Sequence, residues 1–129
     1  MECKDHQIIL ALGSNFEQER NMEKAMQCLR SLFPDIRFSR ILWTEPIGMV
    51  SDRFVNALAV AHSELPMEEL EARLKDIEKA CGRCQEEKER GIIRMDIDLM
   101  QYGEEKLHLK DWSRDYVLTL LECLRTSVE

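Results

Sequence analysis

Apolar positions along the 129-residue chain recur at a spacing of two in some stretches and of three to four in others, which predicts a mixture of strands and helices. Residues 8–12 are apolar throughout and are stopped by Gly13, so this run predicts a strand buried on both faces and central in a sheet. The segment 45–53 is rich in turn-forming residues and predicts a loop of functional interest. The predicted strands are residues 7–12, 36–43, 54–61 and 92–100.

Helical spacing of apolar residues begins near Met22 and continues until Pro34, which ends the first predicted helix. A second helix is expected to begin after Pro66 and to end before Gly82. The predicted helices are residues 22–33, 67–81 and 116–124, with a short extra strand at 106–109. The order strand, helix, strand, strand, helix, strand predicts a single α+β domain covering residues 1–129, with helices on one face of a sheet.

The composition narrows the function. Apolar residues make up 44% and charged residues 33%, which suits a folded domain. A net charge of -7 disfavours nucleic acid and anionic membranes as partners. No apolar run approaches the roughly 20 residues of a spanning helix, and residues 1–6 lack the pattern of a secretory signal. We expect a cytoplasmic protein that is a monomer or a weak homodimer.

Five cysteines are scattered through the chain, which predicts reduced thiols rather than a disulfide framework. Cys81 and Cys84 form a Cys-x-x-Cys motif, but a structural zinc site needs a second pair of ligands, and the sequence offers none. The favoured interpretation is one packed thiol and one loop thiol, with metal or redox use as the alternative.

The candidate chemistry lies in the last predicted strand. Alternation places Arg94, Asp96 and Asp98 on one face, with the two carboxylates close enough to hold divalent cations, for which Mg²⁺ is the natural choice. Taken alone, the two acids fit a solvated sheet face better than a metal site. The preceding loop adds Arg83 and Arg90 among several glutamates, which fits either a polyphosphate site or a mixed-charge solvated loop.

Four short motifs resemble the 6-hydroxymethyl-7,8-dihydropterin pyrophosphokinase family and follow one another in that family's order up to about Gly103. They are Ala11-Leu12-Gly13-Ser14-Asn15; Thr44-Glu45-Pro46-Ile47-Gly48 with Phe54-Val55-Asn56-Ala57; Ile77-Glu78 with Gly82-Arg83; and Asp96-Ile97-Asp98-Leu99 with Tyr102-Gly103. The resemblance implies a ferredoxin-like βαββαβ core with an antiparallel sheet and a C-terminal helix. It also implies transfer of pyrophosphate from ATP to a pterin, with AMP as co-product and two Mg²⁺ ions.

The resemblance carries roles over by position. Asp96 and Asp98 would hold the metal ions, and Arg83, Arg94 and the two aspartates would form the catalytic set. The pterin would be bound by Thr44, Ile47, Phe54, Asn56 and Tyr116, with the two aromatics sandwiching the ring. The nucleotide side would comprise Glu78, Arg83, Arg90, Leu99 and Arg114. The loop at residues 84–90 would be a mobile cover over ATP.

Two departures from the family pattern bear on activity. Ile93 stands where the family usually has an arginine, and Arg94, one residue later, is expected on the opposite strand face unless a bulge restores it. We therefore expect a weakened enzyme. The stretch between Gly103 and Arg114 is also shorter than in the family, so His108 either replaces a family histidine or is a half-exposed strand residue, the interpretation we favour.

Three functions follow, in order of preference: a Mg²⁺-dependent pyrophosphokinase of folate biosynthesis, a relative that binds pterin or nucleotide without turnover, and a plain α+β interaction domain. Pterin-dependent formation of AMP separates the first from the other two, and stabilisation by ligands separates the second from the third.

Overall fold

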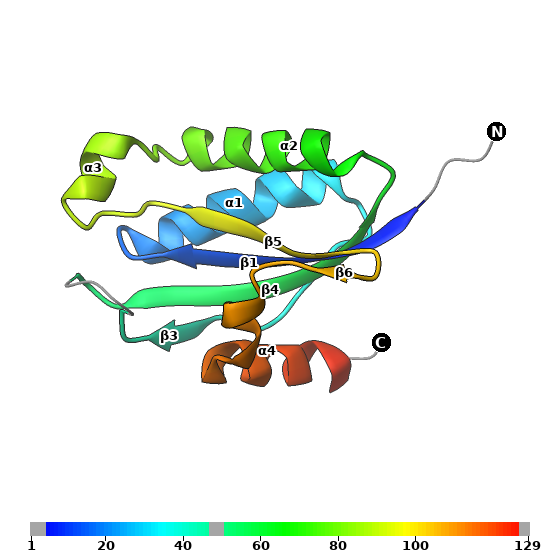
Figure 1. Cartoon of the computed structure of the whole chain (residues 1–129). Coiled ribbons are helices and arrows are strands. Elements are labelled where there is room, and N and C mark those ends of the chain that lie inside the picture. The colour runs from blue at the N-terminus through cyan, green and yellow to red at the C-terminus, as the bar shows by residue number, and fades with distance from the viewer. Residues whose placement is uncertain (1–4, 47–50, 127–129) are drawn as a thin grey trace.

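The computed structural model describes residues 5–46 and 51–126, which form one sheet with helices on both of its faces (Figure 1). The elements follow in the order β1 (His6–Ser14), α1 (Gln18–Leu32), β2 (Arg37–Phe38), β3 (Leu42–Thr44), β4 (Phe54–Ser63), α2 (Met67–Ala80), α3 (Gln85–Glu89), β5 (Asp96–Tyr102), β6 (Glu105–Lys106), the 3₁₀ helix η1 (Leu109–Ser113) and α4 (Asp115–Thr126). The predicted α+β class with an antiparallel sheet and a C-terminal helix is confirmed.

The sheet has the strand order β2-β4-β1-β5-β6, with β3 also paired to β4. As predicted, β1 is central, and it pairs antiparallel with β4 on one side and with β5 on the other. In β5 the register shifts opposite Ile9 and Leu10, so one extra residue is accommodated there and the strand is bulged. The two neighbours of β1 carry Phe54, Asn56, Asp96 and Asp98 of the site described below.

The prediction that the helices cover only one face of the sheet is wrong. Helices α1 and α2 lie on one face, and α4 lies on the other (Figure 1). Alternate residues of β4 explain this arrangement, because Ala57 and Ala59 pack in the core under α1 and α2, whereas Leu58 and Val60 pack against α4. A strand buried on both faces requires a cover on each.

Two predicted strands are shorter than expected. Residues 36–43 form two separate strands, because Ser39 interrupts the ladder and its Oγ accepts a hydrogen bond from the backbone N–H of Leu58 at 2.8 Å. The extra strand predicted at 106–109 ends at Lys106. It is followed by η1, which begins after His108, a residue with a left-handed backbone at φ 52°.

The connection before β5 is also more structured than expected, because the predicted loop 82–91 contains α3. Asn15, just after β1, holds the end of this connection. Its Nδ2 donates to the carbonyl of Gly91 at 2.8 Å, and its Oδ1 accepts from the N–H of Ile93 at 2.7 Å. The Asn15 side chain therefore links the residues before β5 to the end of β1, and β5 begins only at Asp96.

Cys81 is buried at the end of α2 and Cys84 is exposed before α3, which matches the predicted packed thiol and loop thiol. Among the helices of the described residues, none combines the length and the apolar character needed to cross a bilayer.

Candidate functional site

The site lies on the same face of the sheet as α4. Its floor is a hollow in the part of that face that α4 does not cover. On this face of β1 stand Ala11 and Gly13, which have almost no side chain. Gly13 pairs with Asn56 of β4 on one side and with Asp96 of β5 on the other, and Ala11 pairs with Asp98. Small residues on the central strand thus open a space between an amide on one neighbour and two carboxylates on the other.

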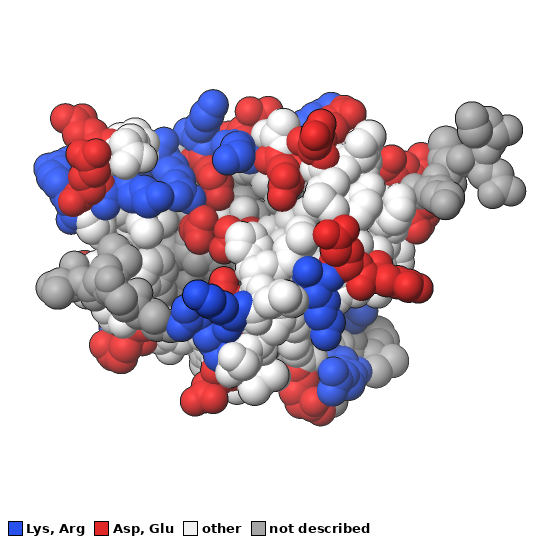
Figure 2. Space-filling model, in the orientation of Figure 1, with Lys and Arg blue, Asp and Glu red and all other residues white. Residues whose placement is uncertain are grey.

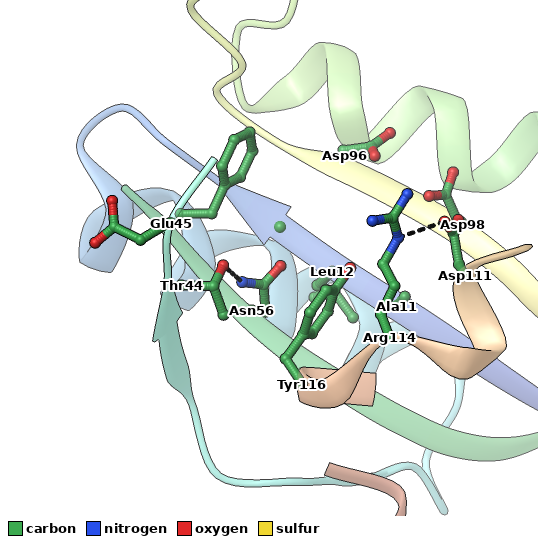
Figure 3. Close-up of a pocket in the computed structure, with 12 residues that line it drawn as sticks. Ala11, Leu12, Thr44, Glu45, Asn56, Asp96, Asp98, Asp111, Arg114 and Tyr116 are labelled. Carbon is green, nitrogen blue, oxygen red and sulfur yellow. Dashed lines mark hydrogen bonds and ion pairs between the residues drawn. The ribbon is translucent and has the colours of Figure 1, made fainter. Parts of the chain in front are cut away.

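The first cavity above this floor encloses about 190 Å³. Thr44 and Asn56 line one side, where Asn56 Nδ2 donates a hydrogen bond to Thr44 Oγ1 at 2.6 Å. Figure 3 shows Tyr116 and Arg114 lining the cavity opposite these residues, with the guanidinium of Arg114 pointing toward β5. The full lining is Ala11, Leu12, Gly13, Thr44, Glu45, Phe54, Asn56, Asp96, Asp98, Asp111, Arg114 and Tyr116. Two aromatic rings, one amide, one guanidinium and four carboxylates suit a flat polar ring that carries a hydroxyl group.

A second cavity of about 280 Å³ lies across β5 from the first, and Asp96 and Asp98 line both. Its lining is Glu71, Leu74, Lys75, Glu78, Arg83, Asp96, Ile97, Asp98, Leu99 and His108. The two carboxylates therefore stand at the junction of the cavities, where groups bound on either side would meet.

The carboxyl of Asp98 has an unusual environment. Burial is the main cause that raises the pKa of Asp98 to about 7, and the charge of nearby Asp96 raises it further, while His108 opposes the shift. In the part of the chain that the structure describes, no Lys or Arg forms an ion pair with Asp98. A carboxylate that is partly desolvated, next to a second acid and without a cation, is electrostatically suited to bind one.

Arg83 is held at the same junction by α2 and β5. Its Nη1 lies 2.8 Å from Asp96 Oδ1 and 3.3 Å from Glu78 Oε2. Glu78 also accepts the backbone N–H of Ile97 at 2.7 Å, which ties the end of α2 to β5. Burial raises the pKa of Glu78, although this hydrogen bond and Arg83 oppose the effect. The guanidinium is thus oriented by two acids and borders the second cavity.

Basic side chains continue beyond Arg83. A third cavity of about 300 Å³ between α2 and α3 shares Lys75, Glu78 and Arg83 with the second, and it adds Lys79 and Lys88. Figure 2 shows Lys and Arg side chains gathered around α3 and the adjoining end of α2. This local positive charge in an acidic protein favours an anionic ligand over the third cavity and over the part of the second that contains Lys75 and Arg83.

Arg94 does not share the face of Asp96 and Asp98 as the alternation predicted, because β5 begins after it. Its guanidinium binds Glu87 of α3 through Nε and Nη2 and stacks over the ring of Phe16 at 4.6 Å. Arg94 lines neither the first nor the second cavity.

The other predicted site residues fall into three groups. Brought together around the two cavities are Thr44, Phe54, Asn56, Glu78, Arg83, Asp96, Asp98, Leu99, Arg114 and Tyr116. Arg90 is exposed after α3 and lines neither of these cavities. Ile47 lies outside the described residues.

Sequence reasoning missed four charged residues that line the first two cavities: Glu45, Glu71, Lys75 and Asp111. Helical spacing could have found Lys75, which lies three residues before Glu78 on the same helix face. Asp111 carried no such signal, because η1 was expected to be a strand or a connection. The favoured interpretation of His108 as a half-exposed strand residue is wrong, since it is exposed, precedes η1 and lines the second cavity.

The carboxylate pair fits Mg²⁺. The described residues contain no group of three or more His, Cys, Asp and Glu side chains that could hold a metal ion by themselves. Mg²⁺ commonly binds through only one or two carboxylates and takes its remaining ligands from water and substrate phosphates. Asp96 and Asp98 at the junction of two cavities match that donor set.

The antiparallel α+β fold and the joined cavities define a small-molecule-binding domain with an aromatic and amide-lined compartment beside a charged one. Residues 9–126 match the model of the 7,8-dihydro-6-hydroxymethylpterin-pyrophosphokinase (HPPK) family, and the chain belongs to this family. The family that the four motifs indicated is thereby confirmed.

Curated relatives agree with this assignment. The chain is 29% identical over 141 residues to the mitochondrial folate synthesis bifunctional protein of Pisum sativum, with coverage of 100% of this chain and 27% of that protein. It is 30% identical over 126 residues to the folate synthesis bifunctional protein of Arabidopsis thaliana, with coverage of 89% and 26%. The chain therefore spans about a quarter of the length of these relatives.

Proposed function

We propose that the protein transfers a pyrophosphoryl group from ATP to the hydroxymethyl group of 6-hydroxymethyl-7,8-dihydropterin and releases AMP, as a step of folate biosynthesis. Family membership supports this reaction over binding without turnover. The observation that carries the proposal is the position of Asp96 and Asp98, which line a ring-sized cavity on one side and, on the other, a charged cavity that contains Lys75 and Arg83.

The first cavity is the proposed pterin site. Phe54 and Tyr116 would flank the flat ring by offset stacking, and Asn56, held by Thr44, would hydrogen-bond its polar edge. Ile47 would complete this site, as the family resemblance implies. In this orientation the hydroxymethyl group points toward the carboxylate pair.

The second cavity is the proposed ATP site. Arg83 would contact phosphate oxygens, and Glu78 and Leu99 would contact the nucleotide. Arg114, which lines the first cavity, would reach the transferring group from the other side of the carboxylates. Asp96 and Asp98 would hold two Mg²⁺ ions, which neutralise charge on the phosphates when bound. Lys75 and the exposed Arg90 add positive charge to this side of the molecule.

The reaction requires the protein to position the two substrates and to stabilise the negative charge on the transferring group. The hydroxymethyl oxygen forms a bond to the β-phosphorus of ATP, and the bond from that phosphorus to the oxygen that bridges it to the α-phosphorus breaks. The bridging oxygen leaves with AMP, and the hydroxyl proton passes to solvent. Arg83 and Arg114 would stabilise the charge on the transferring phosphoryl oxygens from opposite sides of β5.

Ile93 and the engagement of Arg94 by Glu87 leave this site with fewer arginines than the family pattern implies, so we propose a slow enzyme. The cytoplasmic location and the monomeric or weakly dimeric state stay predictions of the sequence.

The test is to incubate the protein with MgCl₂, ATP and the reduced hydroxymethylpterin, and to measure AMP by chromatography. We expect pterin-dependent AMP, reduced at least about 100-fold in Asp96→Asn and in Asp98→Asn. Asp76→Asn, a carboxylate change on the exposed side of α2, is the matched control and should keep full activity. If calorimetry shows that both ligands bind while the wild type forms no AMP, the protein binds without turnover and our proposal is overturned.

A further inference from the structure

Arg114 is held by a carboxylate that the reaction outlined above does not use. Its Nε donates to Asp111 Oδ1 at 2.9 Å, and both side chains are about one third exposed, at 34% and 32%. Both line the first cavity beside Asp96 and Asp98. Figure 3 shows the guanidinium reaching from the start of α4 toward β5, with its remaining nitrogens turned to the cavity.

The backbone of η1 builds this contact. His108 adopts a left-handed conformation, and its carbonyl accepts the N–H of Asp111 at 2.9 Å. The carbonyl of Asp111 in turn accepts the N–H of Arg114 at 3.1 Å. In a 3₁₀ turn, side chains three residues apart lie above one another, so this turn sets Asp111 directly beside Arg114. The indole of Trp112 donates to the carbonyl of Leu107 at 2.9 Å and fixes the turn to β6.

The hydrogen bond through Nε determines which donors of Arg114 can bind an anion. A guanidinium carries five N–H donors, and four of them are on the two Nη atoms. With Nε bound to Asp111, the Nη atoms remain available to an anion in the cavity. Without Asp111, a flexible arginine next to Asp96 and Asp98 would be drawn to those carboxylates, among which Asp98 has no cationic partner in the described part of the chain. It would then compete with the metal ions for the same oxygens.

We propose that Asp111 is a positioning residue for the pyrophosphoryl transfer, which orients Arg114 through Nε so that its Nη atoms face the transferring group. This inference rests on the proposed function and extends it to a residue outside the predicted site. Asp111 touches no substrate in this role, so its effect is exerted entirely through Arg114.

The experiment is a double-mutant cycle on kcat and KM, using Asp111→Ala, Arg114→Ala and the double variant. We expect Asp111→Ala to lower kcat about 10-fold, with the KM for the pterin changed less than about 3-fold, and Arg114→Ala to lower kcat about 100-fold. The double variant should match Arg114→Ala, because Asp111 has nothing left to position. Asp111→Asn keeps an oxygen acceptor for Nε and should recover most of the activity.

Glu122→Gln is the matched control. Glu122 forms a similar pair with Arg125, three residues later on α4, and both are exposed outside the cavities. It should leave kcat unchanged. If Asp111→Ala and Arg114→Ala multiply in the double variant, or if Asp111→Ala keeps the wild-type kcat, this inference is overturned while the proposed function stands. A wild type without pterin-dependent AMP instead defeats the proposed function.

Discussion

Arg94 binds both carboxylate oxygens of Glu87, with Nε at 2.7 Å from Oε1 and Nη2 at 2.9 Å from Oε2. The same guanidinium lies 3.7 Å from Glu17 and stacks over Phe16, so it joins α3 to the turn between β1 and α1. This hydrogen-bonded pair lowers the pKa of Glu87 and raises that of Arg94. The arginine closest in sequence to the metal-binding candidates thus anchors α3, which lies in the segment 84–90 that we expected to cover ATP.

The first prediction concerns this anchor. Glu87→Gln removes the charge that Arg94 pairs with, so the segment around α3 should open more often and become a better protease substrate. Limited trypsin digestion measures this as the rate of cleavage after Lys88 and Arg90. We expect an increase of several-fold over the wild type.

Glu86→Gln makes the same chemical change one residue earlier, on an exposed side chain of α3. It should leave the cleavage rate as in the wild type. Equal rates in Glu87→Gln and Glu86→Gln would mean that the pair with Arg94 does not hold the segment.

Strand β5 and the residues just before it show how far the sequence could predict the site. Alternation correctly placed Asp96 and Asp98 on one face of a strand and Ile97 and Leu99 in the core, because strand geometry alone fixes that pattern. It failed at Arg94, because the end of a strand depends on tertiary hydrogen bonds. Here Asn15, 78 residues away, accepts a hydrogen bond from the backbone N–H of Ile93, so the residues before Asp96 do not continue the strand and its alternation.

The covered faces of the sheet illustrate a second limit. The amphipathic pattern correctly predicted the final helix, but it could not say which face that helix covers. That choice depends on Leu58 and Val60 of β4, which need partners opposite to α1 and α2. The apolar run at residues 8–12 of β1 indicated burial on both sides, and a cover for each face follows from it.

The second prediction concerns pH and metal. The folded pKa of Asp98, about 7, lies above the value of about 4 expected in the unfolded chain. The folded state therefore binds more protons, so the stabilisation that Asp98 contributes below pH 4 is lost as the pH rises through 7. In metal-free protein, the melting temperature of Asp98→Asn relative to the wild type should rise between pH 5 and pH 8.

Magnesium should reverse this loss, because it binds the deprotonated carboxylate. Excess MgCl₂ should raise the melting temperature of the wild type more at pH 8 than at pH 5, and it should leave Asp98→Asn unchanged. Asp76→Asn, the exposed control on α2, should behave as the wild type at both pH values. A magnesium effect that is equal at the two pH values would contradict the role of Asp98.

The third prediction concerns the floor of the first cavity, the proposed pterin site. A Cβ on Gly13 would lie 3.3 Å from Asn56 Oδ1, so the Asn56 side chain must shift by a few tenths of an ångström, whereas its distance of 3.6 Å from Phe54 Cδ2 is an ordinary van der Waals contact. If the first cavity binds the pterin as proposed, Gly13→Ala should raise the KM for the pterin about 10-fold, while the free energy of unfolding changes by less than about 1 kcal/mol. Steady-state kinetics and urea titration measure the two quantities.

Gly103→Ala provides the opposite case. Gly103 has φ 62°, and a Cβ there would lie 3.2 Å from His6 Cδ2; neither residue lines the first or the second cavity. This variant should lose about 1–3 kcal/mol of stability with an unchanged KM. If Gly13→Ala lost stability and kept its KM, the floor of the site would lie elsewhere.

The fourth prediction concerns α4, which covers the face of the sheet next to the site. Leu120 is fully buried against Leu58, Met100 and Val117, so Leu120→Ala should lower the free energy of unfolding by about 2–5 kcal/mol through lost burial and a residual cavity. Leu118 on the same helix is 52% exposed, and Leu118→Ala should cost less than about 0.5 kcal/mol. Urea denaturation of both variants measures the difference. Tyr116 and Arg114 lie at the start of α4, so the packing of this helix fixes the position of both site residues. Equal small losses of stability in Leu120→Ala and Leu118→Ala would show that α4 packs only loosely on the sheet and does not fix them.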